Sequence, residues 1–128
     1  MKKILIISQI AIGFVLGWLI WAMSVKITGH IEPWDSDLPI YSAYLVISGF
    51  LTATIEPKYF WIGPVFIYFG QLVFTVFSYN AHGAVILPPF ISLLIFGSVQ
   101  GFVGAGIGFV LRNRKRSPKQ NLSGNPTP

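Results

Sequence analysis

The chain has 128 residues, of which 53% are apolar and 10% are charged, and it contains no cysteine. Its mean hydropathy is +0.66 and its formal net charge is +5. A soluble domain carries about 25% charged residues, so this chain has too few charges to cover a water-facing surface. The composition excludes a soluble enzyme, a disordered chain and a disulfide-rich scaffold, and it indicates an integral membrane protein.

Four apolar runs approach the length of about 20 residues that a helix needs to cross a membrane. In chain order they cover residues 4–25, 38–55, 59–79 and 89–111. The fourth run begins at two prolines, which a helix accepts in its first turn because the N–H groups there have no partner within the helix. The pattern predicts an all-α integral membrane protein with four transmembrane helices in a compact bundle, formed by one domain of residues 1–111.

The first run can also be compared with a cleaved signal peptide, because Lys2 and Lys3 precede it and the small residues Ala22 and Ser24 lie near its end. Its apolar stretch is about twice as long as the apolar region of a signal peptide. Two tryptophans, Trp18 and Trp21, also crowd the cleavage position. We therefore interpret this run as a membrane anchor.

The distribution of lysine and arginine predicts the orientation, because these residues are retained on the cytoplasmic side. A four-span threading places eight of them on one side and only Lys26 on the other. Both termini are therefore expected to face the cytoplasm, as in a protein of the bacterial inner membrane. The eight residues are Lys2, Lys3, Lys58, Arg112, Arg114, Lys115, Arg116 and Lys119.

Residues 112–128 are basic at first and then rich in Ser, Asn, Gly and Pro, which predicts a disordered cytoplasmic tail. The basic residues directly after the fourth run are expected to contact anionic lipid headgroups, at about 1 kcal/mol for each residue. Because they end a membrane span, we do not expect a nucleic-acid partner. The predicted headgroup contacts are Arg112, Arg114, Lys115 and Arg116.

Aromatic residues near the ends of the runs predict belts at the two membrane surfaces. The outer belt is expected to contain Trp21, Trp34, Tyr41 and Tyr79, and the inner belt Tyr59, Phe60 and Trp61.

Small residues follow one face of the predicted helices. In the fourth helix, the glycines are spaced by four, three and four residues, which keeps them on one face. Glycine costs about 1 kcal/mol relative to alanine in a soluble helix, and in membranes such a face usually allows helices to approach closely. The alternative is that part of the face lines a narrow path or docks another membrane protein. The predicted packing residues are Gly97, Gly101, Gly104 and Gly108, together with Gly13 and Gly17 in the first helix.

Two glutamines lie near the middle of their spans. Gln71 and Gln100 fall at similar depths on helices that run in opposite directions. The two side chains are therefore expected to form an intramembrane hydrogen-bonded pair worth roughly 0.6 to 2 kcal/mol. The alternative is that they contact a solute.

No catalytic, cofactor-binding or metal site is expected. No histidine or charged residue lies deep in a span, whereas proton-coupled transporters usually need an intramembrane carboxylate or histidine. An outer cluster of oxygen ligands and imidazole could hold a divalent cation, but its spacing fits no recognised site, and a solvated loop is the preferred interpretation. The cluster consists of His30, Glu32, Asp35 and Asp37, with His82 on the other outer loop.

These patterns predict a small, non-enzymatic membrane protein that acts through helix–helix contacts, as an accessory or assembly partner of another membrane protein or of itself. The alternative is a minimal channel or facilitator formed by a homo-oligomer. A third possibility is a lysis-type pore protein with a basic tail.

Overall fold

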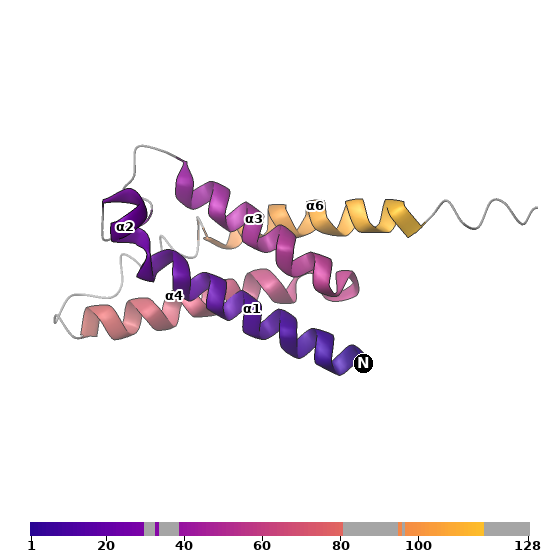
Figure 1. The fold of residues 1–128 in the computed structure, drawn as a ribbon, viewed down its shortest axis with the longest axis horizontal. Helices are drawn as coiled ribbons and strands as arrows, with labels where there is room; N and C mark the ends of the chain where they lie inside the picture. Colours follow the sequence, from indigo (N-terminus) through magenta and orange to yellow (C-terminus); the bar gives the residue numbers. More distant parts are fainter. Residues whose placement is uncertain (30–32, 34–38, 81–94, 96, 117–128) are drawn as a thin grey trace, which may run out of the picture.

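The computed structural model describes residues 1–29, 33, 39–80, 95 and 97–116. Within these residues every regular element is helical, which confirms the all-α prediction. Along the chain, α1 and α4 run in one direction and α3 and α6 in the other (Figure 1). The elements are α1 (Lys2–Ala22), α2 (Ser24–Thr28), α3 (Ile40–Ile55), the short 3-10 helix η2 (Pro57–Tyr59), α4 (Ile62–Asn80) and α6 (Ser98–Arg116).

The first predicted run is divided between two helices. α1 ends at Ala22, and Met23 separates it from α2. α2 ends at Thr28 and is capped by Gly29, whose φ of 77° lies in the left-handed region. Glycine adopts this conformation without a steric penalty and commonly ends helices in this way. The run 4–25 is therefore not one continuous helix.

The last helix continues beyond the predicted boundary. α6 does not stop at Leu111 but extends through the basic residues to Arg116. Arginine and lysine are good helix formers, and cations are stabilising at a helix C-terminus. The expected disordered tail therefore begins with a helical turn. Residues 117–128 and the start of this span near Pro89 lie outside the described residues.

Helix length identifies one candidate membrane span. Among the described helices, α1 is the one that is long and apolar enough to cross a membrane, and its position near the N-terminus is shared by signal sequences. α3 and residues 62–78 of α4 are apolar but shorter. The number of spans therefore stays a prediction.

The helices pack as two pairs of parallel neighbours. α1 makes its most extensive contact with α4, and α3 with α6. Helices that follow one another in the chain run in opposite directions and contact one another less. The buried cluster that joins α1, α3 and α4 consists of Ile20, Trp21, Tyr41, Leu45 and Ile67.

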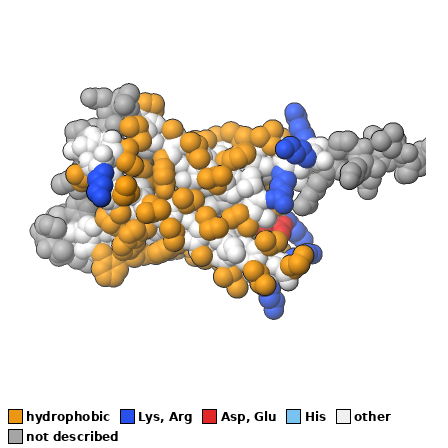
Figure 2. Space-filling model, viewed as in Figure 1, with side chains coloured by type: hydrophobic (Ala, Val, Ile, Leu, Met, Phe, Trp, Pro, Cys, Tyr) orange, Lys and Arg blue, Asp and Glu red, His pale blue; other side chains and the backbone are white. Residues whose placement is uncertain are grey.

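The surface and the interior differ in the kind of side chain they hold. Figure 2 shows hydrophobic side chains over the body of the molecule, with Lys and Arg gathered mainly at one end. Many large apolar side chains are exposed, including Ile4, Ile7, Phe77 and Val99. The buried polar residues are Gln9, Ser24, Ser48, Thr52, Gln71 and Thr75.

Candidate functional site

The contact between α1 and α4 repeats every four residues. Gly13 faces Gly63, and a Cβ atom at Gly13 would lie 2.9 Å from the Gly63 carbonyl oxygen. One turn later, a Cβ atom at Gly17 would overlap the Ile67 carbonyl. Only a residue without a side chain lets the two backbones come so close, as in small-residue packing of membrane helices.

Polar side chains close both ends of this contact. Gln9 Nε2 donates a hydrogen bond of 3.1 Å to the Tyr59 carbonyl. Trp21 Nε1 donates one of 3.2 Å to Gln71 Oε1. Both bonds join residues that are 50 positions apart, the same offset that relates Gly13 to Gly63. A single parallel register therefore aligns four successive turns of α1 with the segment from Tyr59 in η2 to Gln71 in α4.

The contact between α3 and α6 follows the same design. A Cβ atom at Gly104 would overlap the Val46 carbonyl, and one at Gly108 would lie 3.0 Å from the Phe50 carbonyl oxygen. Gln100 Nε2 donates a hydrogen bond of 3.0 Å to Ser42 Oγ, which is 58 positions away. The two glycine contacts have this offset as well.

The four glycines of the predicted stripe, of which Gly97 directly precedes α6, face two different neighbours. Gly104 and Gly108 face α3, as described above. A Cβ atom at Gly101 would lie 3.4 Å from Pro64 Cβ, and one at Gly97 would lie 3.3 Å from Gln71 Nε2. Both of these partners belong to α4. All four glycines are buried. Gly104 and Gly108 face α3, whereas Gly97 and Gly101 lie between α4 and α3: a Cβ atom at Gly97 would also lie 3.5 Å from the Tyr41 hydroxyl, and one at Gly49 would overlap the Gly101 carbonyl.

Gln71 is the centre of a buried hydrogen-bond cluster. Its Oε1 accepts hydrogen bonds from Trp21 Nε1 and, at 2.6 Å, from the Tyr41 hydroxyl. The Thr75 hydroxyl donates to the Gln71 carbonyl at 2.8 Å. Gln71 is completely buried, and Trp21 and Tyr41 are 3% and 4% exposed. This cluster ties α1, α3 and α4 together at one level.

The predicted outer aromatic belt is therefore wrong for Trp21 and Tyr41. Both rings point inward, because their polar groups find an acceptor in Gln71. Sequence position near the end of an apolar run does not reveal which way a ring turns. In the inner belt, Trp61 is 50% exposed. Trp34 and the side chain of Tyr79 lie outside the described residues.

The predicted pairing of Gln71 with Gln100 is also wrong. Gln71 Nε2 and Gln100 Oε1, the atoms left over from the bonds described above, both lack a hydrogen-bond partner within the described structure. The two residues do lie at one level, because they bond to neighbouring residues of α3, Tyr41 and Ser42. Successive helical residues project about 100° apart, so the two glutamines lie on different sides of α3.

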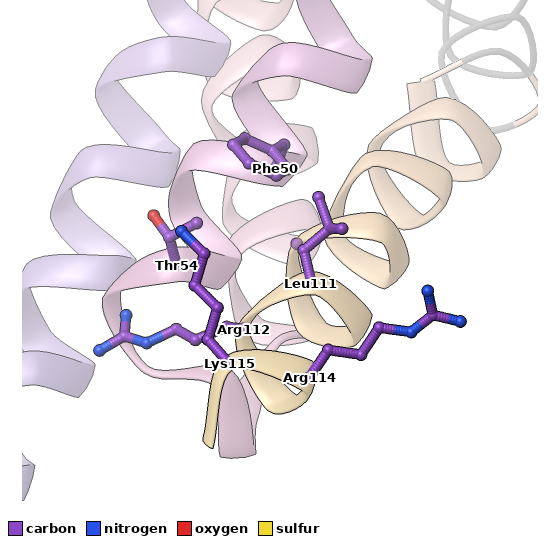
Figure 3. Close-up of a pocket in the computed structure, with 7 residues that line it drawn as sticks. Phe50, Thr54, Leu111, Arg112, Arg114 and Lys115 are labelled. Atoms are coloured by element: carbon purple, nitrogen blue, oxygen red, sulfur yellow. The ribbon is translucent and has the colours of Figure 1, made fainter. Parts of the chain in front are cut away.

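The cytoplasmic end that the sequence predicts carries an open groove. It has a volume of about 630 Å³ and lies between α3 and α6 (Figure 3). The predicted headgroup contacts Arg112, Arg114 and Lys115 line it, whereas the side chain of Arg116 lies outside the described part of the chain. The other lining residues are Phe50, Thr54, Gly108 and Leu111.

No metal site can be assigned within the described residues, where no three His, Cys, Asp or Glu side chains come together. The outer cluster named above, with His30, Glu32, Asp35, Asp37 and His82, lies outside those residues.

The chain matches no protein-family model, no curated protein and no solved structure. A functional assignment therefore depends on the geometry of the chain itself.

Proposed function

We propose that the chain is a small, non-enzymatic integral membrane protein that crosses the membrane four times. In this proposal it acts through helix–helix contacts, as an accessory or assembly partner of another membrane protein. The observation that carries the proposal is the placement of polar and glycine residues inside and of large apolar residues outside.

The outward apolar surface favours lipid as the solvent. Only 28% of the apolar window of α1 is buried within the chain, although a core helix of a soluble protein would be mostly buried. Soluble monomers rarely expose large continuous apolar patches. In a membrane, the exposure of apolar side chains carries no free-energy cost, because lipid tails are as apolar as leucine. Close packing and hydrogen bonds then hold the helices together.

The two ends of the molecule support a cytoplasmic location of both termini. The start of α1, the connection at η2 and the end of α6 lie at one end of the bundle (Figure 1). These segments carry Lys2, Lys3, Lys58 and the basic residues of α6, whereas α2 at the opposite end carries Lys26. Such an asymmetry is the usual signal for retention of one side in the cytoplasm.

The short helices are compatible with four spans. The 16 residues of α3 correspond to roughly 24 Å at 1.5 Å per residue, which is less than the hydrocarbon thickness of about 30 Å. Short segments are accommodated by local thinning of the bilayer and by long flanking side chains that reach the interface.

Contact rather than transport is favoured by the close packing of the helices. Backbone meets backbone at Gly17 and Gly104, and Ile20, Leu45 and Ile67 fill the space beside these contacts. The exposed apolar faces are then the surfaces on which another membrane helix would bind.

A second candidate is the minimal channel or facilitator built from several copies. It is favoured by three buried amide atoms that have no hydrogen-bond partner within the described residues: Gln9 Oε1, Gln71 Nε2 and Gln100 Oε1. Buried polar groups are costly when unpaired, and water or a solute in an oligomer would satisfy them.

Reporter fusions test the threading, and flux measurements separate the two candidates. We expect a reporter after Arg116 to be active in the cytoplasm and one after Gly29 to be active outside. A tail reporter that is active outside would overturn the four-span threading. Purified chain in liposomes should produce no solute flux, and a co-purifying membrane protein should be recovered in mild detergent. Flux that depends on Gln71 would favour the channel.

A further inference from the structure

We propose that the groove between α3 and α6 binds one anionic phospholipid. Its headgroup phosphate lies at Lys115 and Arg112, and an acyl chain lies on Phe50, Gly108 and Leu111. This inference rests on the proposed function, because it needs the groove to face the cytoplasmic leaflet.

The floor of the groove is apolar and has room for a chain. Gly108 lies at the inner edge of the groove, where α6 packs closely on α3: a Cβ atom there would lie 3.3 Å from Cδ2 of the Phe50 ring. Leu111 extends the floor toward the outside and is 48% exposed. The volume of about 630 Å³ exceeds what a few water molecules would occupy, at about 30 Å³ each.

The rim of the groove gathers positive charge on one side. Figure 3 shows the Lys115 ammonium directed toward Thr54 and the Arg112 side chain on the same side of α6, whereas Arg114 points away. The Thr54 hydroxyl donates to the Leu51 carbonyl at 2.7 Å. Lys115 and Arg112 therefore form the basic side of the groove.

The charge of this end selects an anion. Glu56 is the one acidic residue in the described part of the chain, and the same end carries six lysines and arginines: Lys2, Lys3, Lys58, Arg112, Arg114 and Lys115. A phosphate can accept hydrogen bonds from both a guanidinium and an ammonium. An occupant that joins a phosphate to a long apolar chain matches the rim and the floor together, and the lipids of the cytoplasmic leaflet supply it.

Lipid competition on the full chain tests the inference. The chain is purified in detergent micelles and mixed with equal amounts of phosphatidylglycerol and phosphatidylcholine that carry the same acyl chains. Native mass spectrometry then measures which lipid remains bound. We expect one phosphatidylglycerol to be retained in preference to phosphatidylcholine.

Three variants separate a built site from general attraction. Lys115→Gln should lower the retained phosphatidylglycerol about fivefold, as expected for one basic contact. Lys3→Gln removes the same charge at the same end of the bundle, outside the residues that line the groove, and should change retention by less than twofold. Leu111→Asn keeps all charges and should lower retention of the lipid by disturbing the floor. All three residues are exposed, so the fold should tolerate these changes.

Two results would overturn the inference. Equal losses in Lys115→Gln and Lys3→Gln would mean that charge alone attracts the lipid. Displacement of the lipid by millimolar glycerol phosphate would mean that the floor contributes nothing. Either result leaves the reporter fusions unaffected, whereas a wrong threading shows in those fusions whatever lipid is bound.

Discussion

The α1–α4 pair and the α3–α6 pair share one contact geometry but differ in the polar contacts at their two ends. Each is a parallel pair in which glycine meets a backbone carbonyl at four-residue steps. In α1–α4, hydrogen bonds from Gln9 and Trp21 close both ends. In α3–α6, one end is closed by the bond from Gln100 to Ser42, and the other end opens into the groove at Thr54.

This difference in the flanking polar contacts shows that a stripe of small residues can belong either to a sealed helix contact or to one that leaves room for a ligand. Glycine spacing determines how closely two helices approach. The polar residues that flank the glycines determine whether the contact is sealed. A sealed pair serves as the scaffold of the bundle, and an open pair leaves a place for a ligand.

The largest expected effect tests whether both pairs depend on backbone contact. Gly17→Leu and Gly104→Leu should each lower the stability by about 3 kcal/mol, because added bulk in a packed interior forces the backbones apart. The melting temperature in detergent measures this loss. Gly106→Leu is the matched control, because no atom lies within 4 Å of a Cβ at that position. Similar melting temperatures for all three variants would contradict the close approach in both pairs.

The next effect concerns the sealed end of α1–α4. Gln71→Leu removes the acceptor of two buried hydrogen bonds and should cost about 1 to 3 kcal/mol. A double-mutant cycle with Tyr41→Phe should give a coupling energy of about 0.6 to 2 kcal/mol. Chemical denaturation in mixed micelles measures all four variants. A coupling energy near zero would mean that the Tyr41 bond adds no stability.

A smaller effect distinguishes the two glutamines. Gln100→Leu should cost about 0.6 kcal/mol, since it removes one partly exposed bond to Ser42. Combined with Gln71→Leu, its cost should add within about 0.5 kcal/mol, because the two amides do not bond to each other. The same denaturation series checks this sum. A larger coupling energy would restore the direct pair that the sequence suggested.

The smallest expected effect is a difference in stability among alanine variants of three glycines in α6. Gly106→Ala should raise the stability by up to about 1 kcal/mol, the difference in helix propensity between the two residues. Gly101→Ala should be close to neutral, because its methyl group would lie at van der Waals distance from Pro64. Gly104→Ala should be clearly destabilising in the same thermal assay. If Gly101→Ala proves as costly as Gly104→Ala, the division of the stripe between α4 and α3 is incorrect.

Much of the helical framework is readable from the sequence. Long apolar runs predict α1, α3 and α4, because a helix has to satisfy its own backbone where water is scarce. The glycine face of α6 is also visible, since spacing by three and four residues is a property of one helix.

What the sequence does not reveal is how the helices are turned and aligned. Depth along a run places Gln71 and Gln100 at one level, but it cannot say on which side of α3 each lies. The partners of Gln71, Trp21 and Tyr41, were missed for the same reason. One signal was present: Gln9, Gly13, Gly17 and Trp21 are spaced by four residues.

The repeated step of four residues has a mechanical consequence for α1. A slide of α1 along α4 by four residues, about 6 Å, would bring glycine to a carbonyl again, whereas a smaller slide would drive backbone into side chains. The glycine contacts therefore permit discrete positions but do not choose among them. Trp21 selects one position, because its acceptor is a side chain, Gln71 Oε1, whereas the acceptor of Gln9 is a main-chain carbonyl, a group that every residue carries. Exchanging Trp21 for leucine would therefore allow α1 to occupy more than one register along α4.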